Sequence, residues 1–462
     1  MPKISIIMPS LNVVSYIREC MESVICQTLE EIEVLCVDAG STDGTWEVLE
    51  EYARKDRRIR LIKSSKKSYG YQMNRGIEEA SGEYIGIVET DDFILPEMYE
   101  RLYLCAKEND AEVVKSDFDV FTTLEDGERI FLRYSLKKYS CITYNTLYKA
   151  EDYRNHKQTI DVFIWNGIYK KNFLKENQIL FQETPGAAFQ DCGFRYQVAL
   201  NLKRGFFLED SFYRYRRDNI NSSTYNNKCV LFNLMECQNL LKVAKRTGKT
   251  SKEQMSFLAK EIAIIAHRPY VELLTWSQPA KESKEALDGF RILLKSFMDQ
   301  GLLGRASVTR EEWLEIRMFI ENPECYAYYA QLKAEIAAQE IKGFLKNIAG
   351  KRQVILFGSG YVGSCVYCLI RNNGIENIVA FCDNNRSKWK SSYMGYEVIS
   401  PEDAVMFYPD AYFLITVMGH SKEIERQLQT FGVDRKRIGV YGFTTFPMDC
   451  TNIVMRACDN RS

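Results

Sequence analysis

The first 120 residues of the chain alternate between short apolar runs, which predict strands, and amphipathic stretches, which predict helices. Each predicted strand is therefore joined to the next through a helix. Alternation of this kind is typical of an α/β fold with a mainly parallel sheet and helices on both faces. The predicted strands are residues 4–8, 32–37, 59–62, 84–88 and 112–116, and the predicted helices are 16–27, 45–54, 71–80 and 96–107.

Polar residues gather where three of these strands end. The loops are Pro9-Ser10-Leu11-Asn12, Asp38–Gly44 and Glu89-Thr90-Asp91-Asp92. Ligands of parallel sheets bind beyond the carboxyl ends of the strands, where these loops would meet. Each loop alone also fits an ordinary turn, since Asn, Asp, Gly and Ser form turns for backbone reasons. Their agreement on one edge predicts a shared ligand site.

The third loop places three carboxylates, Glu89, Asp91 and Asp92, within four residues. Mg²⁺ or Mn²⁺ prefers such oxygen ligands and usually completes its shell with phosphate oxygens and water. The cluster therefore predicts a nucleotide-phosphate site. The alternative is a turn that leads into a helix beginning at Pro96.

Length and charge narrow the class of protein. A chain of 462 residues predicts two or three domains, and 61 basic against 62 acidic residues offer no general field for nucleic acid. No apolar run approaches the ~20 residues of a membrane span, and the apolar run at the N-terminus is too short for a signal peptide. We expect a cytoplasmic protein with no transmembrane segment and no nucleic-acid partner.

Few residue types remain for catalysis. The fourteen cysteines are scattered and favour reduced core thiols over zinc sites or disulfides. The three histidines do not accompany a nucleophile motif. Carboxylates must therefore carry the chemistry.

A different pattern begins after Gly350. A strand at 354–357 is followed by Gly358-Ser359-Gly360-Tyr361-Val362-Gly363, a helix, a second strand and Asp383, 25 residues after the first glycine. This order predicts a small Rossmann-like domain in which Gly358, Gly360, Gly363 and Asp383 contact a nucleotide. Alternatively, the glycines serve close packing and Asp383 makes a turn. The expected domains are 1–225, a mostly helical 226–349, and 350–462.

Four segments near the N-terminus resemble the motifs of the family 2 glycosyltransferases. The resemblance implies the GT-A fold, with a mixed, mainly parallel sheet and helices on both faces. The segments are 4–12, 37–45, 74–85 and 89–96, and their order and spacing follow the family over roughly residues 3–100. The resemblance implies that a nucleotide-diphospho-sugar, most simply a UDP-sugar, binds at this edge. The residues that it implies for the donor are Pro9, Ser10, Asn12, Asp38, Asn74, Glu89, Thr90 and Asp91.

The same resemblance implies individual roles. Asp38 would accept a hydrogen bond from the base or ribose, and Asp91 would hold Mn²⁺ or Mg²⁺ with Glu89 as a second acid. Glu89 stands where the family usually has Asp, and Met73 stands where many relatives have Arg. If that missing cation matters, Arg75 or the Lys66-Lys67 pair would have to replace it.

Asp191 resembles the base of the family, with Gln190 in place of the usual Glu. The segment 213–223, beginning Tyr213-Arg214-Tyr215-Arg216, is also family-like, and Trp165-Asn166 resembles a segment beneath the acceptor cleft. Asp191 could also serve as a helix N-cap.

Together these features imply a bacterial-type, metal-dependent, inverting glycosyltransferase. Its acceptor would be a glycan or lipid-linked sugar, with the protein in the cytoplasm or peripheral at the membrane. One alternative is a non-catalytic protein that binds nucleotide-sugars, and another is an NAD(P)-dependent oxidoreductase working through the C-terminal domain. The sequence leaves the sugar, the acceptor, the metal and the oligomeric state open.

Overall fold

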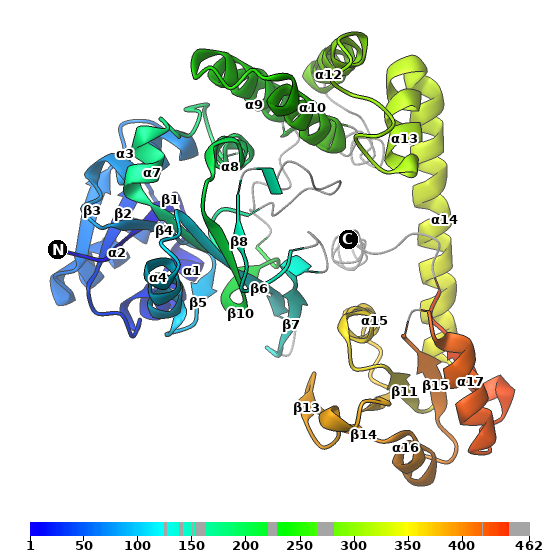
Figure 1. Ribbon diagram of the computed structural model, residues 1–462. Helices are drawn as coiled ribbons and strands as arrows, with labels where there is room; N and C mark the ends of the chain where they lie inside the picture. The colour runs from blue at the N-terminus through cyan, green and yellow to red at the C-terminus, as the bar shows by residue number, and fades with distance from the viewer. Residues whose placement is uncertain are drawn as a thin grey trace. The chain divides into compact units, whose positions relative to one another are not determined.

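The computed structural model describes residues 1–123, 127–137, 142–149, 151–152, 163–187, 189–219, 229–266, 281–417 and 419–442. Contacts divide the chain into two compact units (Figure 1). The first holds Met1–Val120 and Arg133–Gln331, and the second holds Phe121–Leu132 and Leu332–Ser462. The division at residues 225 and 349 stays a prediction.

The predicted α/β fold is confirmed in the first unit. Its sheet has the order β3-β2-β1-β4-β9-β6-β10-β5, with β1 parallel to β2 and β4, and β2 parallel to β3. Every strand and helix predicted before residue 120 is present. They are β1 (Ile4–Ser10), α1 (Val14–Ile25), β2 (Ile32–Asp38), α2 (Thr45–Lys55), β3 (Ile59–Lys63), α3 (Tyr69–Glu79), β4 (Tyr84–Ile87), β5 (Phe93–Ile94), α4 (Met98–Glu108) and β6 (Val113–Thr123). The short β5 was not predicted, and α4 begins at Met98 rather than at Pro96.

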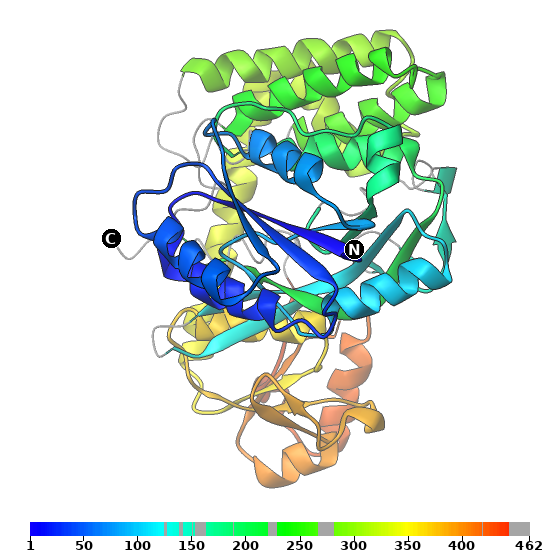
Figure 2. The same cartoon turned by 90° about the vertical axis from the view of Figure 1, so that its left-hand side faces the viewer.

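Helices cover both faces of this sheet. Gly76 of α3 lies against Ile7, and Tyr99 of α4 lies against Gly86. Ile7 pairs with Ile87, the neighbour of Gly86, and successive strand residues point to opposite faces. The helices α3 and α4 therefore pack on opposite sides, and Figure 2 shows α1 and α2 on the side of α4.

The second half of the sheet is antiparallel, which the alternating pattern did not predict. Strand β9 (Gly167–Lys170) inserts between β4 and β6 and runs antiparallel to both. Gly167 permits this pairing, because a Cβ there would collide with the Val114 carbonyl of β6. The remaining elements of this half are β7 (Arg129–Tyr134), β8 (Leu147–Tyr148), α7 (Lys171–Glu176), α8 (Gln190–Asn201) and β10 (Gly205–Arg216).

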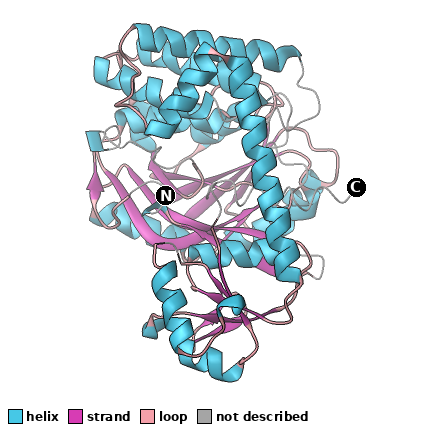
Figure 3. Cartoon of the chain, turned by 90° about the vertical axis from the view of Figure 1, so that its right-hand side faces the viewer, coloured by secondary structure: helices cyan, strands magenta, loops and turns pink. Residues whose placement is uncertain are grey.

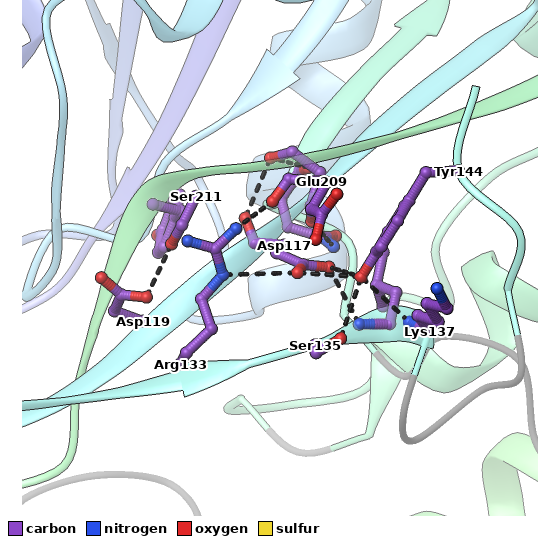
Figure 4. Close-up of polar contacts among 12 residues, drawn as sticks. Asp117, Asp119, Arg133, Ser135, Lys137, Tyr144, Glu209 and Ser211 are labelled. Atoms are coloured by element: carbon purple, nitrogen blue, oxygen red, sulfur yellow. Dashed lines mark hydrogen bonds and ion pairs between the residues drawn. The ribbon is translucent and has the colours of Figure 1, made fainter. Parts of the chain in front are cut away.

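A buried carboxylate, Asp117 on β6, fastens the outer part of this sheet (Figure 4). Its Oδ1 accepts hydrogen bonds from the backbone N–H of Leu136 at 2.9 Å and from the Tyr144 hydroxyl at 2.8 Å. Arg133 Nε approaches Oδ2 at 3.3 Å. Burial raises the pKa of Asp117 to about 6, although these hydrogen bonds and the Arg133 charge act in the opposite direction.

The rest of the first unit is helical, as predicted for this region. Its helices bury a second apolar cluster that includes Leu234, Phe290 and Phe319. Among the described residues, no helix is both long and apolar enough to cross a membrane. The helices are α9 (Cys229–Arg246), α10 (Lys252–Ala266), α12 (Lys281–Asp299), α13 (Arg310–Glu321) and α14 (Pro323–Ala349), the last of which continues into the second unit (Figure 3).

The second unit contains another sheet, with the order β13-β14-β12-β11-β15-β16. From β14 to β16 all neighbours are parallel, and the chain order 3-2-1-4-5 of these strands is that of doubly wound sheets. The elements are β11 (Val354–Phe357), α15 (Tyr361–Arg371), β12 (Ile378–Cys382), β13 (Ser392–Tyr393), β14 (Tyr396–Ile399), α16 (Pro401–Phe407), β15 (Tyr412–Ile415), α17 (Ser421–Thr430) and β16 (Ile438–Val440).

The buried Asp117 predicts a pH-dependent stability. Its pKa of about 6 lies about 2 units above the ~3.9 of an unfolded Asp, so the folded state favours the neutral carboxyl. Between pH 4 and pH 7, the wild type should therefore lose up to about 3 kcal/mol of unfolding free energy relative to Asp117→Asn. Urea unfolding at both pH values measures this difference. Asp210→Asn, which removes a carboxylate that is 37% exposed, is the surface reference. An Asp117→Asn difference that is the same at both pH values would contradict the prediction.

Candidate functional site

The loops after β1, β2 and β4 meet at the carboxyl edge of the parallel strands. Ser10 and Asp38 are register partners, and the Ser10 hydroxyl donates to Asp38 Oδ2 at 2.9 Å. The Thr90 hydroxyl donates to the Pro9 carbonyl at 2.9 Å. The structure thus brings together Pro9, Ser10, Asp38 and Thr90, four of the residues implied for the donor.

Asp38 organises the second of these loops from inside. It is 2% exposed, and its Oδ1 accepts from the backbone N–H groups of Gly40 and Ser41 at 2.9 and 2.8 Å. Asn12 joins the first loop to the second, because its Oδ1 accepts from the Thr42 N–H at 2.9 Å. Asn12 has a φ of 55°, a left-handed conformation that Asn adopts more readily than most residues.

The helix α3 carries one departure from the family pattern, Met73. Gln72 lies beneath the edge, where its amide donates to the carbonyls of Ser10 and Val37 at 2.9 and 2.6 Å. Met73 is fully buried in the core. The side-chain amide of Asn74 donates to the Phe181 carbonyl and accepts from the Phe181 N–H, at 2.9 Å in both cases.

Two of the three cations suggested as replacements for the missing Arg, Arg75 and Lys66, are engaged elsewhere. Arg75 pairs with Glu78 and Glu79 on its own helix, at 2.5 and 2.9 Å. Lys66 pairs with Glu183 at 2.7 Å. By contrast, Arg216 of β10 reaches the acidic loop, since its Nε donates to the Asp91 carbonyl at 2.7 Å.

Glu89 is half-buried, and the Tyr69 hydroxyl donates to its Oε1 at 2.5 Å. Burial raises the pKa of Glu89 to about 8 against this hydrogen bond, and the charges of Asp91 and Asp191 add to the shift. Asp91, in the same loop, and Asp191 of α8 therefore both lie close enough for their charges to act on Glu89. A divalent cation at this place would favour their ionised forms.

Asp91 is partly exposed and its Oδ2 accepts from the Asn219 amide at 2.8 Å. Asp92, next to it, is 1% exposed. Its Oδ1 accepts from the Arg216 N–H at 2.7 Å and its Oδ2 from the Tyr213 hydroxyl at 2.8 Å. The sequence pattern placed Asp92 in the acidic cluster or in the turn toward Pro96, and in the structure it joins the acidic loop to β10. The family-like segment continues into residues 220–223, which lie outside the described residues.

Aromatic packing holds β10 in place. Trp165 is buried and stacks on Tyr213 with ring centroids 4.0 Å apart. Asn166 is also buried, and its amide donates to the Ser116 carbonyl at 2.9 Å. Both residues of the Trp165-Asn166 pair therefore hold the sheet together.

Asp191 lies in the first turn of α8, after Phe189 at the N-cap position with a φ of 62°. The alternative of Asp191 as N-cap is therefore wrong. Burial raises the pKa of Asp191, while Arg195 and the backbone N–H groups of Cys192 and Asp191 oppose this shift.

A chain of hydrogen bonds links the start of α8 to Glu89. The Gln190 amide donates to the Gly186 carbonyl at 3.2 Å, and the Tyr69 N–H donates to the same carbonyl at 2.9 Å. The Tyr69 hydroxyl then reaches Glu89. The residues around Asp191 and Glu89 therefore form one connected edge.

Carboxylate oxygens, the ligands that Mg²⁺ and Mn²⁺ prefer, are present at this edge. In the ranges that the structure describes, no three His, Cys, Asp or Glu side chains are grouped as ligands of one metal. Asp91 and Glu89 supply two carboxylates, which is the usual protein contribution to Mg²⁺ when phosphates complete the shell.

The glycines between β11 and α15 in the second unit differ in the space around them. Gly358 has a φ of 120°, and a Cβ at Gly363 would collide with the Gly358 carbonyl. A Cβ at Gly360 would meet nothing within 4 Å. Asp383 accepts from the Ser359 N–H at 3.0 Å and from Lys388 Nζ at 2.9 Å. Although burial disfavours its charge, hydrogen bonds from Asn385, Ser359 and Lys388 lower the pKa of Asp383.

Sequence comparisons agree with this geometry. Residues 5–198 match the family model described as Glycosyl transferase family 2, and residues 350–439 match a model described as C2185-like, N-terminal. The uncharacterized glycosyltransferase EpsJ of Bacillus subtilis is 30% identical over 224 residues, which are 48% of this chain and 63% of EpsJ. The glycosyltransferase GlyG of Streptococcus pneumoniae is 30% identical over 220 residues, which are 46% of this chain and 70% of GlyG. The matched part thus spans less than two thirds of EpsJ.

Solved structures show the same fold. Residues 1–349 of S. aureus TarS superpose with a TM-score of 0.52 at 18% identity, covering 73% of this chain and 91% of that one. A further crystal structure of that TarS fragment contains UDP-GlcNAc. The fold, the matched segment and the identity to GlyG together show that this chain belongs to glycosyl transferase family 2.

Proposed function

We propose that the protein transfers a sugar from a nucleotide-diphospho-sugar to a hydroxyl of a glycan or lipid-linked acceptor, with inversion at the anomeric carbon. The donor is a UDP-sugar, which the UDP-GlcNAc bound by TarS supports. The observation that carries the proposal is the joining of Glu89, Asp91 and Asp191 at one edge, next to the loops of Asn12 and Asp38. We place the reaction in the cytoplasm or at its membrane surface.

Each residue has a part in this proposal. Asn12, Asp38 and the Pro9-Ser10 loop hold the nucleoside, while Thr90 keeps the acidic loop next to them. Asp91, with Glu89, would hold Mn²⁺ or Mg²⁺, which when bound would neutralise charge on the departing diphosphate. Asn74 acts indirectly, by holding Phe181 and the segment after it against α3.

Asp191 is the proposed base. As the acceptor oxygen attacks the anomeric carbon, its proton passes to the Asp191 carboxylate and the bond from that carbon to the diphosphate oxygen breaks. The products are the glycosylated acceptor and a nucleoside diphosphate. Its position in the first turn of α8, close to Glu89, supports this role.

The non-catalytic alternative shares the donor site and differs only in turnover. Titration calorimetry that finds UDP-sugar affinity, with no UDP release for any acceptor, would favour it. The oxidoreductase alternative places hydride chemistry in the second unit. If the full chain forms NAD(P)H, and the Asp191→Asn variant forms it at the same rate, the result would favour the oxidoreductase over the glycosyltransferase.

The C-terminal turn is proposed as a separate nucleotide site in a Rossmann-like module. Gly358 forms the turn, Gly363 allows the helix to approach, and the space in front of Gly360 leaves room for a phosphate. Asp383 would orient the turn through Ser359 and meet ribose at its remaining lone pairs.

Removing the metal ligand should suppress transfer. Asp91→Asn should reduce the rate of UDP release from UDP-GlcNAc and other UDP-sugars by about 100-fold or more. The reason is that no bound metal would then neutralise the charge that develops on the diphosphate in the transition state. A chelator should do the same to the wild type, and Mn²⁺ should restore it. Asp110→Asn is the control, since Asp110 also carries a charge but lies before β6, at 73% exposure. Full activity of Asp91→Asn would contradict the assignment.

The base should give the reaction a pH dependence. Asp191 must be ionised to accept a proton, so the rate should fall as pH drops through its raised pKa. Asp191→Asn should lose about 100- to 10,000-fold in rate while it still binds UDP. A pH–rate profile and calorimetry with UDP check both statements. An Asn variant that transfers sugar as the wild type does would exclude Asp191.

Nucleotide binding to the second unit can be blocked at one position. Gly360 has an extended backbone and open space around its Cα, so Gly360→Leu should fold normally but obstruct a ligand. Calorimetry of the full chain with NAD, NADP, ATP and UDP should show a nucleotide whose affinity falls at least about tenfold in Gly360→Leu, since a phosphate must approach the backbone closely there. Gly304→Leu, at a site equally free of neighbours, should bind normally. If Gly360→Leu binds every nucleotide as the wild type does, the turn serves packing only.

A further inference from the structure

A second buried acid lies behind the proposed base. Glu236 of α9 is 3% exposed, and α9 packs on α8 (Figure 1). A Cβ at Gly193, two residues after Asp191, would overlap with Oε1 of Glu236. The carboxyl of Glu236 therefore rests on the backbone of the same helical turn that carries Asp191.

The surroundings of Glu236 do not explain it as a packing residue. Among the described residues, its Oε1 has no hydrogen-bond partner, although buried polar atoms are almost always bonded. Burial raises the pKa of Glu236 to about 8, and the charge of Asp191 adds to this shift. An apolar side chain of similar volume would fill the same space without a buried polar atom.

The charged and titratable groups around this position come mainly from α8. They are Asp191, Cys192 and Arg195, together with Cys237 of α9. Glu261 of α10 acts on Arg195. From α12, Ala286, Leu287 and Phe290 belong to the same apolar cluster as Leu234 and Cys237. Asp191 is thus the acid that acts most directly on Glu236.

We propose that Glu236 is a positioning residue for the base: its carboxyl packs against the backbone of the turn of α8 that carries Asp191 and places a second acid behind that turn. This inference rests on the proposed role of Asp191. When Glu236 ionises, the added negative charge makes Asp191 a stronger base, because like charges favour the protonated form of their neighbour. The helical region thereby acts on the chemistry without touching the substrate.

The test compares Glu236→Gln with the wild type in single-turnover transfer from a UDP-sugar between pH 6 and pH 9.5. Gln keeps the volume against Gly193 but cannot ionise. In the wild type, the rate should first rise with pH as Asp191 ionises. At higher pH it should rise a further two- to fivefold, with a midpoint near pH 8, because ionised Glu236 makes Asp191 a modestly stronger base. Glu236→Gln should lose this second rise while its KM for the donor stays within about twofold of the wild type, because Glu236 does not contact the donor.

Glu253→Gln, an exposed change on α10, is the matched control and should retain the second rise. A Glu236→Gln profile identical to that of the wild type would overturn the proposal and leave Glu236 as a space-filling group. If Glu236→Gln does not fold, Glu236→Met supplies similar volume without a titrating group and is judged by the same profile. Failure of the proposed function gives a different result, since Asp191→Asn would then retain transfer.

Discussion

The candidate site depends on Asp92, a buried carboxylate that joins the acidic loop to β10. Asp92 is buried and accepts hydrogen bonds from both the hydroxyl of Tyr213 and the backbone of Arg216. Charge in such a place is costly, and the pKa of Asp92 is raised well above its usual value by burial and by Asp91. The Arg216 side chain in turn fixes the Asp91 carbonyl. The orientation of Asp91 is therefore set by residues of β10, more than 100 positions along the chain.

Local patterns were enough to predict the first half of the sheet. The strand Ile4–Ser10 is rich in apolar residues and buried along its whole length, and the helix α1 buries Ile17, Met21 and Val24 at helical spacing. Neighbouring residues are therefore enough to predict the type of each element. The convergence of the loops then follows from parallel topology. The antiparallel half could not be predicted in this way, because β9 has only four residues and pairs with strands far away in the sequence.

The same limit applies to the site. Asp38 and Glu89 could be selected because they follow strands, but their partners could not. Tyr69, which binds Glu89, belongs to a helix start, and Glu236 lies in a helix that reads as ordinary core. The partner of Glu89 also gives a physical reason for the substitution of Glu for Asp, since the longer side chain reaches the Tyr69 hydroxyl. Met73 fits its place equally well, because that position lies inside the core.

The insertion of β9 between β4 and β6 has a consequence for how the chain is made. One edge of β4 pairs with β1, which precedes β4 in the sequence. The other edge pairs with residues 167–170 of β9, which are synthesised much later. During synthesis, the apolar strand Tyr84–Ile87 is therefore without its second native neighbour for the whole time in which the intervening segment leaves the ribosome. Open strand edges of this kind invite pairing with other chains, and distant pairings form slowly. We therefore expect the first unit to be especially exposed to misassembly while the residues between Ile87 and Gly167 are being synthesised.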